Sequence, residues 1–99
     1  METRYEWDSA KAESNLKKHG IAFEDAAQVF ADPFAVAEQD RIENGEYRWQ
    51  TLGTVDGCLL LLVAHTIRDD VEGTEIIRII SARRAVPRER RRYERNRSL

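Results

Sequence analysis

The sequence contains few of the residues that mark disulfide-stabilised or metal-binding proteins. Its 99 residues include one cysteine, two histidines, two prolines and five glycines. A single cysteine excludes an internal disulfide framework, and Cys58, which opens an apolar run, is predicted to be a buried, inert thiol in a reducing compartment. Two histidines and one cysteine offer no metal-ligand spacing, so no zinc site and no cofactor are expected. No glycine-rich phosphate loop is present either.

Long hydrophobic segments are absent as well. The longest apolar run, Cys58 to Ala64, is far too short to span a bilayer. No leading stretch resembles a signal peptide. We therefore expect a cytoplasmic protein that makes no membrane contact. The length suits one domain over residues 1–99 with a single modest core.

The charge is distributed unevenly along the chain. Residues 1–80 hold 8 basic and 16 acidic side chains, a net −8, whereas residues 81–99 hold 8 basic and 2 acidic side chains, a net +6. This asymmetry indicates a polyanion or an acidic protein as the partner of the C-terminal end. The alternative is a solvated helix that keeps the protein soluble.

The N-terminal half is predicted to contain a short strand and two helices. Residues 5–7 form the strand. Residues 9–19 form the first helix, because Asp8 can cap its N-terminus and Gly20 can adopt the left-handed conformation after its end. A second short helix follows from residue 23, although its start has no good capping residue, and Pro33 ends it.

The second half is predicted to be a strand meander followed by a helix. A strand over residues 34–40 leads into a loop over residues 41–46. Three more strands are expected, of which the last two are apolar enough to be central; they cover residues 47–53, 58–66 and 76–82. Pro87 suits the first turn of a closing helix over residues 87–95. The fold class is thus α+β: a small, mostly antiparallel sheet of four to five strands, two N-terminal helices and a C-terminal basic helix.

The closing helix has almost no apolar surface. Tyr93 is its one aromatic residue, and Val86 lies just before it. A helix that is polar all round cannot be held by burial in a core. We expect it to lie on a surface, with its arginine stems covering apolar area, or to be ordered by a partner.

A tight turn at Asp56-Gly57 predicts a specific pairing of the two strands around it. If these are the two central residues of a type I′ turn, Val55 lies opposite Cys58. Arg48 then lies directly opposite His65, with Cβ atoms ~5 Å apart. The other face of this hairpin is aromatic and aliphatic, so it should pack against the helices.

The predicted pair has a chemical use. A guanidinium lowers the proton affinity of a neighbouring imidazole, and a neutral histidine can act as a general base near neutral pH. Arginine can bind a phosphate through two hydrogen bonds. Arg78 joins this pair if the loop over residues 68–75 preserves the strand parity. Alternatively, His65 is an ordinary strand residue and Arg48 pairs with Glu46 or another carboxylate.

With these motifs assembled, the chain resembles the BrnT family of toxins from type II toxin–antitoxin systems. The resemblance rests on three stretches that span nearly the whole chain: "YEWDSAKAESNLKKHGIAFEDAAQVFADP", "RWQTLGTVDGCLLLLVAHT" and "IRIISARRAVPRERRRYE". It implies a fold similar to that of RelE-type toxins and a metal-independent endoribonuclease that inhibits translation. It also implies a ribbon-helix-helix antitoxin (BrnA-like) that forms a hetero-oligomer with the toxin and connects it to operator DNA.

For such a ribonuclease, the resemblance gives the candidate residues their roles. The nucleophile would be the 2′-OH of the RNA, so the protein needs a base, an acid and cations around the phosphate. His65 is the candidate base or acid, and Arg48 and Arg78 are the candidates for phosphate stabilisation. A further set is predicted to bind RNA or the partner: Arg83, Arg84, Lys17, Lys18, His19, Arg88 and Arg91. The alternative for the three residues at 17–19 is that they cap a helix C-terminus.

The chain departs from the family pattern at one position, and a second function fits the sequence. Family members often carry an acidic residue directly after "HT", where this chain has Ile67, so a catalytic carboxylate is not expected there. The alternative function is a non-catalytic binding module that acts with its antitoxin as a transcriptional repressor complex.

Overall fold

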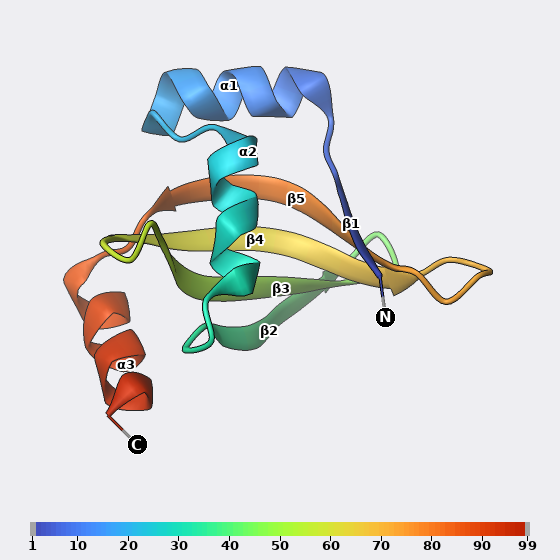
Figure 1. The fold of residues 1–99 in the computed structure, drawn as a ribbon. Helices are drawn as coiled ribbons and strands as arrows, with labels where there is room; N and C mark the ends of the chain where they lie inside the picture. Colours follow the sequence, from blue (N-terminus) through green and yellow to red (C-terminus); the bar gives the residue numbers. More distant parts are fainter. Residues whose placement is uncertain (1, 99) are drawn as a thin grey trace.

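The structure, a computed structural model, describes residues 2–98 as a five-stranded sheet with helices on both of its faces (Figure 1). The strand order is β1-β5-β4-β3-β2; β1 runs parallel to β5, and the other neighbours are antiparallel. The elements are β1 (Thr3–Glu6), α1 (Ser9–His19), α2 (Phe23–Ala26), the 3-10 helix η1 (Ala27–Ala31), β2 (Val36–Glu43), β3 (Glu46–Val55), β4 (Leu59–Asp69), β5 (Glu75–Arg84) and α3 (Pro87–Arg97). The predicted α+β class and element order are confirmed.

The main core lies between the sheet and the helices α1, α2 and η1, which cover one face in Figure 1. Phe23 and Val29 supply the apolar contacts from the helical side and are fully buried. Gly53 of β3 lies directly beneath η1, and a Cβ atom on it would come within 2.8 Å of Val29 Cβ. Only glycine therefore allows the helix to approach the sheet this closely.

The ends of α1 follow the predicted capping. The Asp8 carboxylate accepts a hydrogen bond from the N–H of Ala10 at 2.8 Å, and Gly20 adopts φ 72°. The second predicted helix is divided into α2 and the 3-10 helix η1, and Ala22 gives no side-chain cap. The missing cap at the start is consistent with so short a helical segment.

A buried amide joins α1 to the sheet. Asn15 donates to the carbonyl oxygens of Ile21 at 3.0 Å and Ala82 at 2.9 Å, and it accepts from the N–H of Ala82 at 3.0 Å. β1 pairs with β5 only as far as Arg78. The Asn15 side chain therefore replaces a neighbouring strand at a position of β5 that would otherwise have unsatisfied backbone groups.

The prediction of a loop over residues 41–46 is wrong. β2 and β3 form a hairpin whose two-residue turn, Asn44-Gly45, has φ values of 52° and 78°. These left-handed angles are those of a type I′ turn, for which Asn-Gly is a favoured pair. The sequence contains this Asn-Gly hairpin signal, but the charged residues on either side of it are typical of a loop.

The hairpin register predicted from Asp56-Gly57 is also wrong, by one residue. Both residues have positive φ, but Cys58 belongs to the turn, and Val55 pairs with Leu59. His65 consequently pairs with Trp49 instead of Arg48. The thiol of Cys58, predicted to be buried, is exposed at this turn.

A second irregularity changes the face on which Arg78 lies. The pairing of β4 with β5 shifts between Ala64 and His65, so His65 pairs with Ile79 and Thr66 pairs with Arg78. A one-residue shift moves a side chain to the other face of the sheet. Arg78 therefore lies on the face opposite His65, and the predicted cluster of three residues does not form.

The closing helix α3 packs against the sheet face opposite α1 and α2 (Figure 1). Tyr93 is 4% exposed and joins Leu52, Leu60 and Leu62 in a second small core. The expectation that burial could not hold this helix is therefore wrong in one respect, because a single aromatic side chain anchors it. No helix within residues 2–98 is long and apolar enough to cross a membrane.

Candidate functional site

The sheet face that carries α3 presents a row of polar side chains across four strands. Arg78 of β5 lies beside Thr66 of β4 and beside Glu6 of β1. Arg48 of β3 precedes Trp49, the partner of His65, so extending that register by one residue places Arg48 opposite Thr66. We call Arg48, Thr66, Arg78 and Glu6 the arginine row. The row brings together two of the three predicted catalytic residues, Arg48 and Arg78.

Carboxylates hold the guanidinium groups of the row in place. Glu6 Oε1 lies 2.6 Å from Arg68 Nη1 and 3.5 Å from Arg78 Nη1. The hydrogen bond from Arg68 lowers the pKa of Glu6, so this carboxylate is ionised at neutral pH. At the other end of the row, Arg48 Nη2 lies 3.8 Å from Glu43. The charges of the row are therefore positioned, and partly balanced, by their neighbours.

Two polar atoms in the row have no partner within residues 2–98. Arg48 Nε and Thr66 Oγ1 are both buried and form no hydrogen bond there. Buried polar groups without partners are rare in folded proteins. The middle of the row therefore has hydrogen-bonding capacity that the fold itself leaves unused.

His65 lies on the other side of the sheet, under the helices. It is 1% exposed, its Nε2 atom is 2.7 Å from Thr51 Oγ1, and its ring packs edge-on against Phe30 at 4.8 Å between centroids. Burial lowers its pKa to about 4, so the imidazole is neutral at physiological pH. The predicted Arg48–His65 pair is wrong, and the buried ring cannot touch an RNA strand in this structure.

The basic residues predicted at the end of β5 and in α3 divide between structural and exposed positions. Arg83 forms a two-pronged ion pair with Glu89, with both N–O distances 2.9 Å, and Glu89 also accepts the N–H of Val86 at 3.0 Å. These contacts fix the start of α3. Arg84 is exposed, and Arg88 and Arg91 line an exposed hollow on the outer side of α3.

The third predicted basic group is separate from both of these. Lys17, Lys18 and His19 occupy the last turn of α1, on the helical side of the sheet. Lys17 Nζ is 3.3 Å from Glu13 in an exposed pair one helical turn apart. Cations in this position also interact favourably with the helix dipole. The structure thus divides the predicted residues among the arginine row, the buried position of His65, the segment from the end of β5 into α3, and the end of α1.

The comparisons with known proteins identify the family. A family model described as "Ribonuclease toxin, BrnT, of type II toxin-antitoxin system" matches residues 7–89. The chain belongs to the BrnT family. Its fold is similar to the crystal structure of the Brucella abortus ribonuclease toxin, BrnT, with a TM-score of 0.59 and 23% sequence identity, over 87% of this chain and 99% of that one. No curated protein matches the sequence significantly.

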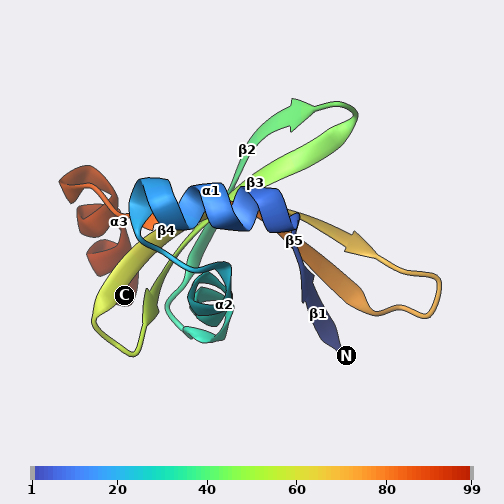
Figure 2. The same cartoon turned by 90° about the horizontal axis from the view of Figure 1, so that it is seen from above.

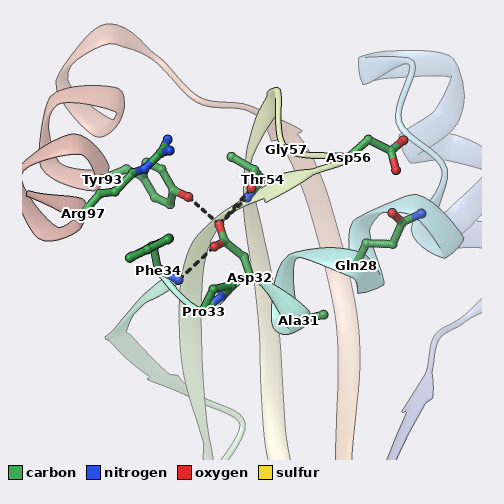
Figure 3. A pocket seen from close by; sticks show the side chains of 10 residues that line it. All are labelled: Gln28, Ala31, Asp32, Pro33, Phe34, Thr54, Asp56, Gly57, Tyr93 and Arg97. Carbon is green, nitrogen blue, oxygen red and sulfur yellow. Dashed lines mark hydrogen bonds between the residues drawn. The ribbon is translucent and has the colours of Figure 1, made fainter.

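In this BrnT-family chain, a second polar centre lies at the junction of η1, β3 and α3 (Figure 3). The Asp32 carboxylate accepts hydrogen bonds from Tyr93 Oη at 2.6 Å and from Thr54 N and Oγ1 at 2.9 and 3.0 Å. It also accepts the N–H of Phe34 at 2.8 Å. Burial raises the pKa of Asp32, but these donors outweigh that effect and lower it overall. A pocket of ≈ 460 Å³ lies beside this carboxylate.

The sequence analysis did not predict this Asp32 centre. The one signal for it was Tyr93, the single aromatic residue of α3. Its bonds are all used within the fold, so we assign it the role of holding α3 to the sheet. Other contacts act with it: Asn96 Nδ2 donates to the carbonyl of Phe34 at 3.1 Å, and the Arg97 guanidinium lies 5.6 Å above the Phe34 ring. Arg92 pairs with Glu38 of β2.

The BrnT-family site contains no recognisable metal centre in the part of the chain described here. Among residues 2–98, no group of three or more His, Cys, Asp or Glu side chains is arranged to hold a metal ion. The chemistry that the side chains themselves can supply is charge stabilisation by guanidinium groups, hydrogen bonding by a hydroxyl, and proton transfer by a carboxylate.

Proposed function

We propose that this chain is an endoribonuclease toxin that cleaves RNA at the arginine row without a metal ion. The observation that carries this proposal is the placement of Arg48 and Arg78 on one sheet face, on either side of Thr66, in a member of a ribonuclease toxin family. Two guanidinium groups on one face suit a phosphate, because guanidinium binds phosphate oxygens through paired hydrogen bonds.

In the proposed reaction the RNA supplies its own nucleophile. The 2′-OH attacks the adjacent phosphorus atom, the bond to the 5′-oxygen breaks, and the products carry a 2′,3′-cyclic phosphate and a 5′-hydroxyl. Arg48 and Arg78 stabilise the negative charge that increases on the phosphate oxygens in the transition state.

The proton transfers require groups other than His65. We assign the acceptor of the 2′-OH proton to the Glu6 carboxylate, which is ionised and lies in hydrogen-bonding range of the two arginines Arg68 and Arg78. The leaving 5′-oxygen takes a proton from solvent water, and the resulting hydroxide takes the proton held by Glu6, which returns the carboxylate to its ionised form. The lowered pKa of Glu6 makes it a weak base, which predicts slow cleavage.

Cleavage of cellular RNA by this chain would inhibit translation. The partner that we propose is a ribbon-helix-helix antitoxin that forms a hetero-oligomer with the toxin and connects it to operator DNA. The family description supports an antitoxin as partner. The exposed arginines Arg84, Arg88 and Arg91, together with Lys17, Lys18 and His19, remain candidates for contacts to RNA or to this partner.

The test is a cleavage assay with the purified chain, freed from its antitoxin, on a labelled RNA in excess EDTA. Cleavage products with 2′,3′-cyclic phosphate ends are expected. Arg48→Ala and Arg78→Ala should each reduce the rate about 100-fold, the usual effect of removing one donor that stabilises a transition-state anion. Arg48→Lys keeps the charge but not the paired hydrogen bonds, and should be intermediate.

Matched controls separate loss of activity from loss of charge or fold. Lys11→Ala removes one exposed cation from α1, far from the row, and should leave the rate unchanged. Thermal melting of each variant verifies folding. Full activity in folded Arg48→Ala and Arg78→Ala variants would refute the proposed site. Loss of the parent's activity in EDTA would refute the metal-independent mechanism.

A non-catalytic binding module is the second candidate. It is favoured by the ion pairs that already engage the row, since Arg48 faces Glu43 and Arg78 faces Glu6. Induction of the chain alone in cells discriminates the two: a toxin arrests growth with loss of RNA, and the Arg78→Ala form does not. A well-folded parent chain that causes no arrest, and represses transcription only together with its antitoxin, supports the binding module.

A further inference from the structure

The helical side of the sheet is not fully covered. α2 and η1 pack over the half near the Asp56-Gly57 turn, and beyond them lies an open groove of ≈ 250 Å³. Its lining residues are mostly apolar or aromatic and come from all five strands and from η1. They include Tyr5, Phe30, Ala37, Ile67 and Ile77, with His65 and Thr51 beneath them. We call this the apolar groove.

Large apolar side chains remain exposed at and beside the apolar groove. Tyr5 is 39% exposed, Ile67 is 40% exposed, and Tyr47 is 56% exposed. Tyr47 lies on the same face of β3 as Trp49 but is not among the residues that line the groove. Seen from above, the β2–β3 and β4–β5 hairpins diverge, and no helix covers their outer ends (Figure 2). Clustered exposed hydrophobic side chains commonly mark a protein-binding site.

The charges around the apolar groove are acidic. Asp69 and Glu75 pair across β4 and β5 on this face, and Glu75 also pairs with Thr3 of β1. Among the described residues, the paired positions of this face near the groove hold no lysine or arginine. Burial, with the negative charge of Glu75 nearby, raises the pKa of Tyr5.

The arginines of the same strands point to the other face. Arg4 and Arg68 both pair with Ile76, and Arg78 pairs with Thr66. Each of these positions lies on the face of the arginine row. The two faces at this end of the sheet therefore differ in both polarity and charge, and a polyanion such as RNA is attracted to one and repelled by the other.

We propose that the apolar groove binds a segment of the antitoxin that inserts apolar side chains and carries lysine or arginine beside them. This inference rests on the proposed function for the identity of the partner, and charge complementarity selects the chemistry of the segment. The groove volume of ≈ 250 Å³ is below the ~300–1,000 Å³ typical of small-molecule pockets, so the groove suits inserted side chains better than a small molecule.

A second copy of this chain fits the groove poorly. Its basic element, α3, has the complementary charge, but the outer side of that helix offers arginine side chains, and its one aromatic residue, Tyr93, is buried against the sheet. Inserting α3 would fill an apolar groove with charged groups, which costs desolvation energy without burial of apolar surface.

The experiment uses calorimetry to measure binding of the cognate antitoxin to the parent and two variants. Ile67→Asp places a charge in the groove and should weaken binding by roughly 10- to 100-fold, as for an interface anchor. Asp69→Lys combined with Glu75→Lys reverses the rim charge and should weaken binding and reverse its salt dependence. Lys11→Ala is the control and should bind as the parent does.

The outcomes separate this inference from the proposed function. RNA cleavage by the free Ile67→Asp variant should equal that of the parent, because the groove and the arginine row lie on opposite faces. If neither form cleaves RNA but the variants still lose the antitoxin, the inference stands and the proposed function fails. The inference would be overturned if both groove variants bound the antitoxin within threefold of the parent. It would also be overturned if folded Ile67→Asp lost RNA cleavage, or if the parent were a dimer that Ile67→Asp made monomeric.

Discussion

Mild acid should destabilise this protein through His65. The imidazole is 1% exposed, and burial lowers its pKa to about 4 from the 6.5 of an exposed histidine. The folded state therefore excludes a proton that the unfolded state binds. Stability is fully present above pH 6.5 and is lost as the pH falls from that value toward 4.

The magnitude follows from the two pKa values. Proton linkage predicts a loss of ~2 kcal/mol in the free energy of unfolding by pH 5 and ~3 kcal/mol by pH 4. Carboxyl groups with lowered pKa values, Asp32 and Glu6 among them, contribute stability that is lost at still lower pH. The interval from about pH 7 to pH 5 therefore isolates the histidine. A loss of this size is a large fraction of the stability of a small domain.

The assay is urea unfolding of the parent and of His65→Gln at several values in that interval. Glutamine retains an amide that can reach Thr51 Oγ1 but has no proton to gain in this range. The variant should be less stable at neutral pH, because it loses the edge-on contact with Phe30, yet its stability should stay constant where that of the parent falls. Equal losses in both proteins, or an NMR titration of His65 near 6.5, would refute the burial argument.

Three further substitutions test the packing. Gly53→Ala should lower the free energy of unfolding by ~1–3 kcal/mol, because the added Cβ meets Val29 at 2.8 Å; an unchanged melting temperature contradicts this. Tyr93→Phe removes the bond to Asp32 and should cost ~1–3 kcal/mol, with faster proteolysis of α3 as the specific sign. Asn15→Ala removes three buried hydrogen bonds and should cost more than Tyr93→Phe in urea unfolding; a smaller cost would show that water replaces the amide.

Local signals in the sequence determined the elements of this protein. Asp8 and Gly20 define the ends of α1 because capping depends on residues within one turn. The apolar runs of β4 and β5 determine that these strands are central in the sheet, since both faces must be buried. The family and its fold class were likewise recognisable from the order of motifs along the chain.

The candidate site depended on features that local signals do not contain. A turn that includes Cys58 shifted His65 by one residue against β3, and an irregularity beside Ala64 placed Arg78 on the opposite face. Because side chains alternate between faces with a period of two, each single-residue shift exchanges a core position for a surface one. The sequence identified Arg48 and Arg78 as site candidates, but only the structure showed that they share a face without His65.

The C-terminal helix α3 also combines features that the sequence determines with contacts that only the tertiary structure decides. Its arginine content and its start at Pro87 are determined by the sequence alone. The contacts that hold it, from Tyr93 to Asp32 and from Arg92 to Glu38, join residues more than fifty positions apart. Such contacts depend on how the chain closes on itself, and only the tertiary structure decided them.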